Sequence, residues 1–227
     1  MINNGLTSQT IKAIDDYTIN EIGIPSMVLM ERAALSITQK LLSKNGDSDN
    51  SYAIVCGTGN NGGDGLAVGR MLHQADKTVR IYLVGNTDKA SEGFTKQLQI
   101  AQNLGLAIQT LDTDPSEPIR GDIVLDALFG IGLSRNVKGP YKTAIEKINR
   151  FEGLIIAVDV PSGLSANTGR PMGIAVKADA TYTIGFMKKG FEQEDAADYT
   201  RELYLLDIGY PNDTLLRNII EEEEAND

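Results

Sequence analysis

The chain alternates short apolar runs with longer stretches in which apolar residues recur every three or four positions. The short runs predict buried strands, because a strand covered on both faces has few polar positions, and the periodic stretches predict helices. Strands are expected at 52–56, 79–84, 106–111, 122–128, 154–160, 180–186 and 203–208. Helices are expected near 11–22, 26–45, 66–73, 94–104 and 141–148.

This alternation predicts an α/β fold with a mostly parallel sheet that is covered by helices on both faces. No stretch between the elements has the character of a domain linker, so a single domain is expected over residues 1–215. Residues 216–227 are strongly acidic, and we expect them to form a solvated, frayed tail.

The composition excludes several classes of protein. The 227 residues carry a net charge of −10, which argues against a protein that binds the phosphate backbone of nucleic acids. A single cysteine, Cys56, and a single histidine, His73, exclude an internal disulfide and a multi-Cys zinc site, and make a His-based metal centre implausible. We interpret Cys56 as a small core residue and His73 as an ordinary surface or packing residue.

Membrane and export signals are missing from the pattern. No apolar run approaches the roughly 18–20 residues that span a bilayer. The first ten residues lack the basic start and apolar centre of a signal peptide. We therefore expect a cytoplasmic protein that does not bind membranes.

Ligands of an open parallel sheet bind beyond the carboxyl ends of the strands, and three such ends carry polar motifs. At the first, Gly57, Gly59 and Gly62 form a G-x-G-x-x-G pattern between a strand and a helix. Glycines allow a ligand to approach the backbone, and a helix N-terminus offers N–H groups to an anion. The alternative is a glycine-rich turn that only permits tight packing. A dinucleotide dehydrogenase would also need an acid where the second strand ends, and here that position holds Gly85–Asn86.

At the second strand end, Asp126 closes an apolar run and is followed by Gly130, Gly132 and Arg135. The glycines would free further backbone N–H groups, and an arginine can meet a phosphate. The alternatives are that Asp126 caps its own loop and that Arg135 is a solvated surface residue.

At the third strand end, Asp159 follows a buried run and precedes Ser162. Burial there favours a raised pKa, which suits a general acid or base, although a carboxylate that caps the turn is the alternative. Together the three ends offer Asn, Asp and Ser oxygens without thiolate or imidazole, a ligand set that suits a hard cation.

These motifs resemble the YjeF N-terminal domain family, the NAD(P)H-hydrate epimerases. The matching segments lie in the family's order and spacing over roughly residues 8–210, and they are 29–34, 60–65, 126–132, 159–163 and Thr183 with Lys188 and Gly190. Ala34 stands where many members have glycine.

The resemblance implies a three-layer α/β/α, Rossmann-like fold. It also implies a potassium ion held by Asn61, Asp126 and Ser162, and a catalytic role for Asp159. Lys188 would either assist by its charge or be a surface lysine. The implied substrate contacts are Asn60, Asn61, Gly62, Gly63, Asp64, Gly130, Ile131, Gly132, Leu133, Ser134, Arg135, Asn136 and Asp159.

The implied reaction interconverts the R and S forms of hydrated NADH or NADPH at the ring carbon that bears the hydroxyl. Inversion of that carbon needs a proton acceptor and donor, whether the ring opens or water leaves and returns. The S form would then feed a separate ADP- or ATP-dependent dehydratase, which many relatives carry as a second domain. The resemblance further implies a homodimer that uses the N-terminal helices.

Two other functions remain as alternatives. Some relatives resemble scaffolds in RNA decapping or lipoprotein-binding partners, but such uses would not require the strand-end carboxylates of Asp126 and Asp159. An ordinary NAD-dependent oxidoreductase is disfavoured by the missing ribose acid and by the lack of an evident hydride-transfer constellation.

Overall fold

The computed structural model describes residues 4–45, 48–111, 114 and 117–226, and these form a three-layer α/β/α domain. Within this part of the chain, seven parallel strands make one sheet in the order β3-β2-β1-β4-β5-β6-β7. The strands are β1 Tyr52–Cys56, β2 Val79–Leu83, β3 Ala107–Thr110, β4 Ile123–Ala127, β5 Leu154–Val158, β6 Ala180–Ile184 and β7 Glu202–Leu206. All seven predicted strands are confirmed, and the sheet is parallel throughout.

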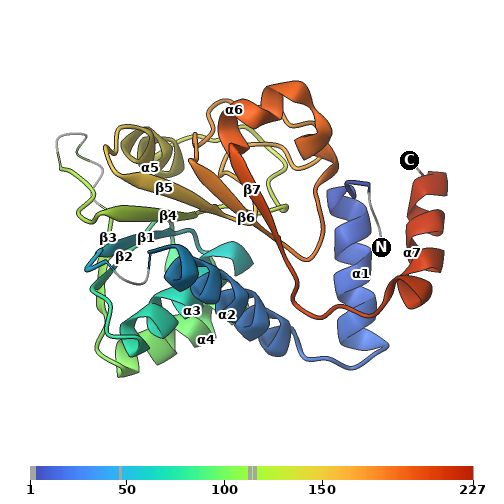
Figure 1. Cartoon of the computed structure of the whole chain (residues 1–227), viewed down its shortest axis with the longest axis horizontal. Coiled ribbons are helices and arrows are strands. Elements are labelled where there is room, and N and C mark those ends of the chain that lie inside the picture. The colour runs from blue at the N-terminus through green and yellow to red at the C-terminus, as the bar shows by residue number, and fades with distance from the viewer. Residues whose placement is uncertain (1–3, 46–47, 112–113, 115–116, 227) are drawn as a thin grey trace.

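The helices cover both faces of this sheet, and α1 stands at its side next to α7 (Figure 1). Figure 1 shows α2, α3 and α4 on one face and α5 and α6 on the other. The helices are α1 Ser8–Asn20, α2 Ser26–Asn45, α3 Asn60–Gln74, α4 Glu92–Asn103, α5 Pro140–Asn149, α6 Ala197–Thr200 and α7 Asp213–Asn226. Short 3₁₀ turns lie at η1 Thr87–Lys89, η2 Lys189–Glu192 and η3 Glu194–Ala196.

Helix α3 is longer than its apolar pattern predicted. It begins at Asn60, so the polar glycine-rich segment that we expected to be a loop forms its first turns. A Cβ atom on Gly65 would lie 2.6 Å from the Cβ of Ala127, and one on Gly62 would lie 1.8 Å from the carbonyl oxygen of Gly57. Close packing on the sheet therefore overrides the low helix propensity of glycine.

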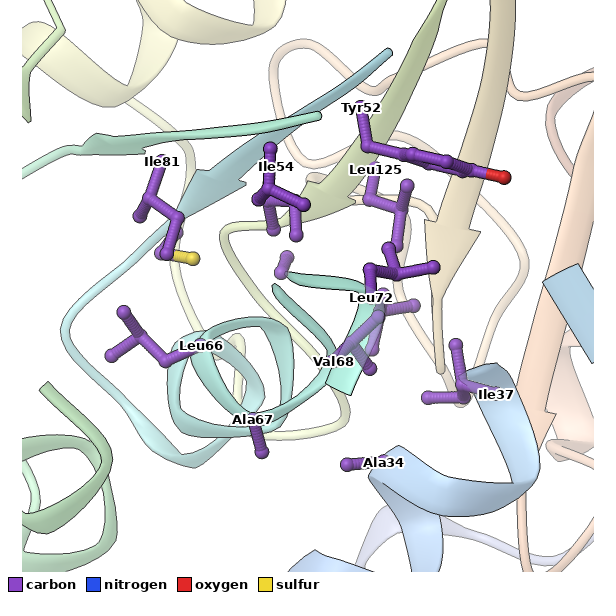
Figure 2. Packing of buried hydrophobic residues seen from close by; sticks show 14 of the residues in the cluster. Ala34, Ile37, Tyr52, Ile54, Leu66, Ala67, Val68, Leu72, Ile81 and Leu125 are labelled. Atoms are coloured by element: carbon purple, nitrogen blue, oxygen red, sulfur yellow. The ribbon is translucent and has the colours of Figure 1, made fainter. Parts of the chain in front are cut away.

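The core between the sheet and this helix layer is apolar and tightly packed. In Figure 2, Ile54, Ile81 and Leu125 point from their strands toward α3. On its other side α3 packs against α2, where Ala67 and Ala34 belong to the same buried cluster. Ala34 is fully buried, so the alanine in place of glycine is accommodated at this contact.

The chain end differs from the frayed tail that we expected. Residues up to Asn226 continue α7, and Asp227 lies outside the described residues. Leu216 is buried and packs with Ile11 and Ile14 of α1. The apolar spacing of Leu216, Ile219 and Ile220 supplies a helix face ahead of the acidic run, and that face anchors the helix.

The single cysteine and the single histidine lie where the sequence predicted them. Cys56 is fully buried in the core, and His73 is an exposed residue of α3. In the described part of the chain, none of the helices combines the length and hydropathy needed to cross a membrane.

Candidate functional site

A cavity of about 640 Å³ opens where the strand order reverses between β1 and β4. This is the place where open α/β sheets bind ligands, and the volume lies within the range of about 300–1,000 Å³ that small-molecule pockets occupy. One wall consists of the segments that follow β1, β4 and β5, and the other of α1 and α2 with Lys188 and Tyr210. Polar strand-end groups thus face a helical wall that carries apolar side chains together with Lys12 and Asp15.

Eight of the predicted site residues line this cavity, namely Asn60, Asn61, Asp64, Gly130, Ile131, Gly132, Leu133 and Asp159. Gly62 and Gly63 instead pack against protein atoms, the carbonyl oxygen of Gly57 and the thioether of Met30, respectively. Ser134, Arg135 and Asn136 are exposed and lie outside the cavity wall.

Asp159 has a strained backbone at the end of β5. Its φ of 67° lies in the left-handed region, which costs a residue with a side chain about 1–3 kcal/mol. The Oδ1 atom of its carboxylate accepts a hydrogen bond from the backbone N–H of Ile184 at 3.1 Å and forms an ion pair with Lys188 Nζ at 2.5 Å. The surrounding structure therefore holds this carboxylate in place through its Oδ1 atom.

Lys188 is the counter-ion of that carboxylate and has only 1% of its side chain exposed. The alternative that Lys188 is a surface lysine is wrong. Its Nζ atom also donates hydrogen bonds to the carbonyl oxygens of Ile184 at 2.8 Å and Phe186 at 3.0 Å. All three donor positions of the ammonium group thus have partners, which a buried charge requires.

Asp126 and Ser162 lie together below the cavity and are both buried. The backbone N–H of Ser162 donates to Asp126 Oδ2 at 2.7 Å, and that of Leu128 donates to Oδ1 at 3.3 Å. Burial raises the pKa of Asp126 to about 6, although these hydrogen bonds oppose the shift. Ser162 Oγ accepts a hydrogen bond at 2.9 Å from the backbone N–H of Phe129.

The segment Phe129–Gly130 connects this buried pair to the cavity floor. A Cβ atom on Gly130 would stand 3.0 Å from Asp159 Oδ2 and 3.3 Å from Asn61 Oδ1. Asn61 is buried, and within the described residues its Nδ2 atom has no hydrogen-bond partner. Asn61 and Asp159 thus lie beside Gly130, and Ser162, which is itself hydrogen-bonded to Asp126, holds the neighbouring Phe129.

The oxygen donors here suit a monovalent cation better than a transition metal. Asn61, Asp126 and Ser162 together supply amide, carboxylate and hydroxyl oxygens with one full negative charge. In the described part of the chain, no group of three or more His, Cys, Asp or Glu side chains gathers as a metal site would require. The unpartnered Nδ2 atom of Asn61 is a hydrogen-bond donor, so an acceptor group of a bound molecule would satisfy it, whereas a cation would be held by the amide oxygen.

Of the acidic residues that share the cavity with Asp159, the sequence predicted Asp64 but did not identify Asp15. Asp15 of α1 lines the cavity and accepts a hydrogen bond from the Tyr210 hydroxyl. Desolvation raises the pKa of Asp15, and desolvation with the charges of Asp159 and Asp15 raises that of Asp64 well above its usual value. No sequence signal marks Asp15, because α1 and the segment after β7 meet only in the folded chain.

Within the described residues, the end of β2 lacks the acidic residue that binds the ribose in a dinucleotide dehydrogenase. Gly85 has a φ of 103°, and a Cβ atom there would stand 2.1 Å from the Tyr141 hydroxyl oxygen. The ring of Tyr141 therefore occupies the space beside the strand end. No carboxylate among the described residues 84–86 is available to hold a ribose there.

Comparison with known proteins adds independent information. The family described as YjeF-related protein N-terminus matches residues 26–190. A protein of Limosilactobacillus fermentum named NAD(P)H-hydrate epimerase is 40% identical over 207 residues, which cover 91% of this chain and 98% of that protein. A protein of Lentilactobacillus buchneri with the same name is 43% identical and covers 90% of this chain and 94% of that protein.

Two further relatives differ in length or in sequence. The bifunctional NAD(P)H-hydrate repair enzyme Nnr of Thermofilum pendens is 37% identical over 96% of this chain, which spans 42% of that protein. The crystal structure of yeast ynu0 superposes with a TM-score of 0.72 at 20% identity and 82% coverage of each chain, which shows a shared fold. Because the family match and the named relatives span most of the sequence, this chain belongs to the YjeF-related N-terminus family.

Proposed function

We propose that this protein is an NAD(P)H-hydrate epimerase, which interconverts the R and S forms of hydrated NADH and NADPH. The observation that carries the proposal is the buried ion pair of Asp159 and Lys188 in the wall of a cavity of about 640 Å³. It is supported by relatives of that name that are about 40% identical over nine-tenths of the chain.

In this proposal the carboxylate of Asp159 exchanges a proton with the hydroxyl oxygen at the carbon that inverts. Its Oδ1 atom is held by Lys188, so Oδ2 is the oxygen that faces the substrate. Open N–H groups in the first turn of α3 and in the Gly130–Gly132 segment would bind the pyrophosphate. Apolar side chains of α1 and α2 would exclude water from the ring.

We propose further that Asn61, Asp126 and Ser162 hold a potassium ion. The donor chemistry fits, because the three side chains offer oxygens and a single full charge. When bound, the ion would supply positive charge beneath the cavity floor and oppose the protonation of Asp126, whose pKa burial raises to about 6.

The same proposal extends to partners and location. Hydrated cofactors form where NADH and NADPH are used, so we place the protein in the cytoplasm, where an S-specific dehydratase would consume the product. The exposed Ile22, Val28 and Leu35, on α2 and the turn before it, support a homodimer through the N-terminal helices. Sedimentation velocity tests the dimer, and a monomer at micromolar concentration would contradict it.

The epimerase activity is tested with purified R-form hydrate. The protein is expected to bring the R and S forms to equilibrium far faster than buffer alone does. The amounts of the two forms are measured over time by chromatography. In a coupled assay, an S-specific dehydratase with its nucleotide would then convert all of a mixed hydrate to NADPH. Conversion that stops when the initial S form is consumed would contradict the proposal.

Removal of potassium is expected to lower stability. At 100 times its dissociation constant, an ion that binds only the folded state contributes about 2.7 kcal/mol, or roughly 5–11 °C in Tm for a chain of this size. Tm is measured in KCl and in LiCl of equal ionic strength. The variant Ser162→Ala should lose the difference, and equal Tm values of the unaltered protein in both salts would contradict the site.

A further inference from the structure

A second carboxyl group faces the cavity from α1, and its position is firmly held. The Tyr210 hydroxyl donates a hydrogen bond to Oδ1 of Asp15, and both residues line the cavity. The Tyr210 ring stacks on Phe186 with centroids 5.0 Å apart, and a Cβ atom on Gly185 would lie 2.4 Å from the same ring. Packing on both sides therefore fixes the hydroxyl that orients Asp15.

The segment that carries Lys188 also anchors α1. The backbone N–H of Leu6 donates to the carbonyl oxygen of Met187 at 2.8 Å, and that of Lys189 donates to the carbonyl oxygen of Leu6 at 2.9 Å. Thr7 then caps α1 by accepting a hydrogen bond from the N–H of Thr10 at 3.1 Å. The helix that carries Asp15 is thus tied to the segment that holds the Asp159 counter-ion.

The charged surroundings of Asp15 favour its protonated form. Desolvation is the largest cause of its raised pKa, and the charges of Asp159 and Asp16 add to it. The hydrogen bond from Tyr210 and the charge of Lys188 act in the opposite direction. The other charged groups of the cavity wall are Lys12, Asp64 and Glu92.

Two carboxyl groups on different elements therefore share one cavity under different conditions. Asp159 is bound to a buried lysine, whereas Asp15 is bound to a neutral hydroxyl. Carboxyl pairs held in different environments are typical of acid and base partners in catalysis. Inversion by loss and return of water would use such a pair, because oxygen leaves one face of the carbon and returns to the other.

We propose that Asp15, oriented by Tyr210, is a second catalytic proton-transfer residue, acting on the ring face opposite Asp159; this inference rests on the proposed epimerase function. The protonated carboxyl gives its proton to the substrate hydroxyl, and the C–O bond breaks with its electron pair leaving on oxygen as water. The ring nitrogen lone pair forms a C=N bond. Water then adds from the other face, the C=N electrons return to nitrogen, and the carboxylate of Asp159 takes the proton.

This scheme is balanced and runs in both directions. One water leaves and one returns, and one proton passes from Asp15 to Asp159 in each inversion. Before the next inversion in the same direction, Asp159 gives this proton to solvent and Asp15 takes one up. The reverse reaction moves the proton back. In H₂¹⁸O each enzymatic inversion is therefore expected to place ¹⁸O in the product hydroxyl. An inverted product that retains its original oxygen would overturn the proposal.

The first test is Asp15→Asn in the full chain, measured with purified R-form hydrate. We expect kcat to fall by about 10²–10⁴-fold, the usual contribution of a general acid or base, with KM nearly unchanged. Asparagine can still accept the hydrogen bond from the Tyr210 hydroxyl, so the packing of Tyr210 in the cavity wall should not change. Glu21→Gln is the matched control, because it removes one negative charge from an exposed position at the C-terminal end of α1 and should keep kcat.

The second test is the pH profile of Tyr210→Phe. Loss of the hydroxyl removes a hydrogen bond that lowers the Asp15 pKa, so the limb of the profile assigned to Asp15 should move to higher pH. A merely structural role of Tyr210 would change Tm without moving that limb. An unmoved limb, or an Asp15→Asn variant with the kcat of the unaltered protein, would overturn the inference.

The outcomes separate this inference from the proposed function. If the unaltered protein epimerises the hydrate and Asp15→Asn does so equally well, the role of Asp15 is wrong and the proposed function stands. If the unaltered protein does not accelerate epimerisation, both are wrong.

Discussion

Replacement of Asp159 by asparagine is expected to lower kcat by about 10²–10⁴-fold, because the amide cannot carry the proton that the carboxylate exchanges. The size and shape of the side chain are kept, so the cavity and KM should change little. The rate of R-to-S conversion in the steady state provides the measurement. Retention of the full kcat would contradict a catalytic role for Asp159.

The same change should also reduce stability, because Lys188 loses its counter-charge while remaining 1% exposed. Removal of one partner from a buried ion pair costs about 3–5 kcal/mol, which corresponds to roughly 6–20 °C in Tm at this chain length. The double variant Asp159→Asn with Lys188→Met should recover stability without recovering activity. A double variant with recovered Tm but low kcat would show that the loss of activity comes from the missing carboxylate and not from unfolding.

Replacement of Gly62 by alanine is expected to cause a large loss of stability. The new Cβ atom would lie 1.8 Å from the carbonyl oxygen of Gly57, and a backbone atom cannot move aside as a flexible side chain can. Overpacking of this kind costs typically about 1–3 kcal/mol. Because backbone must shift here we expect a cost of about 3 kcal/mol, which lowers Tm by roughly 6–12 °C. Thermal unfolding followed by circular dichroism measures the change.

Gly59→Ala is the matched control for that experiment. Gly59 belongs to the same glycine pattern, has a φ of −92°, and would place its Cβ more than 4 Å from any neighbouring heavy atom. Its Tm should therefore remain close to that of the unaltered protein. Helix propensity favours alanine over glycine, so it cannot cause a loss at Gly62. Equal losses in the two variants would therefore show that the contact with Gly57 does not account for the effect.

The local pattern of the sequence determined much of the fold. Short apolar runs in alternation with amphipathic helices were sufficient to predict every strand, because such runs are stable only in a sheet covered on both faces. The strand ends also marked Asn61, Asp126 and Asp159 as polar residues at one edge, since parallel strands end on the same side. At Gly62 the structure shows the tight packing that was the alternative for the glycine pattern, because a Cβ atom there would meet the carbonyl oxygen of Gly57.

Other features depended on contacts between distant segments. The burial of Lys188 requires Asp159 and the carbonyl oxygens of Ile184 and Phe186, and sequence alone left it as a possible surface residue. The acidic end of the chain becomes α7 because Leu216 packs on α1.

The sequence by itself determined the layers of the domain and the sheet edge at which ligands bind, because periodicity and strand direction are local properties. Only the tertiary structure decided which charges meet at that edge. Asp15 and Tyr210 lie 195 positions apart and become partners through the packing of α1 beside the end of β7. The pKa of such a group depends on burial and on neighbouring charges, and both exist only once the chain has folded.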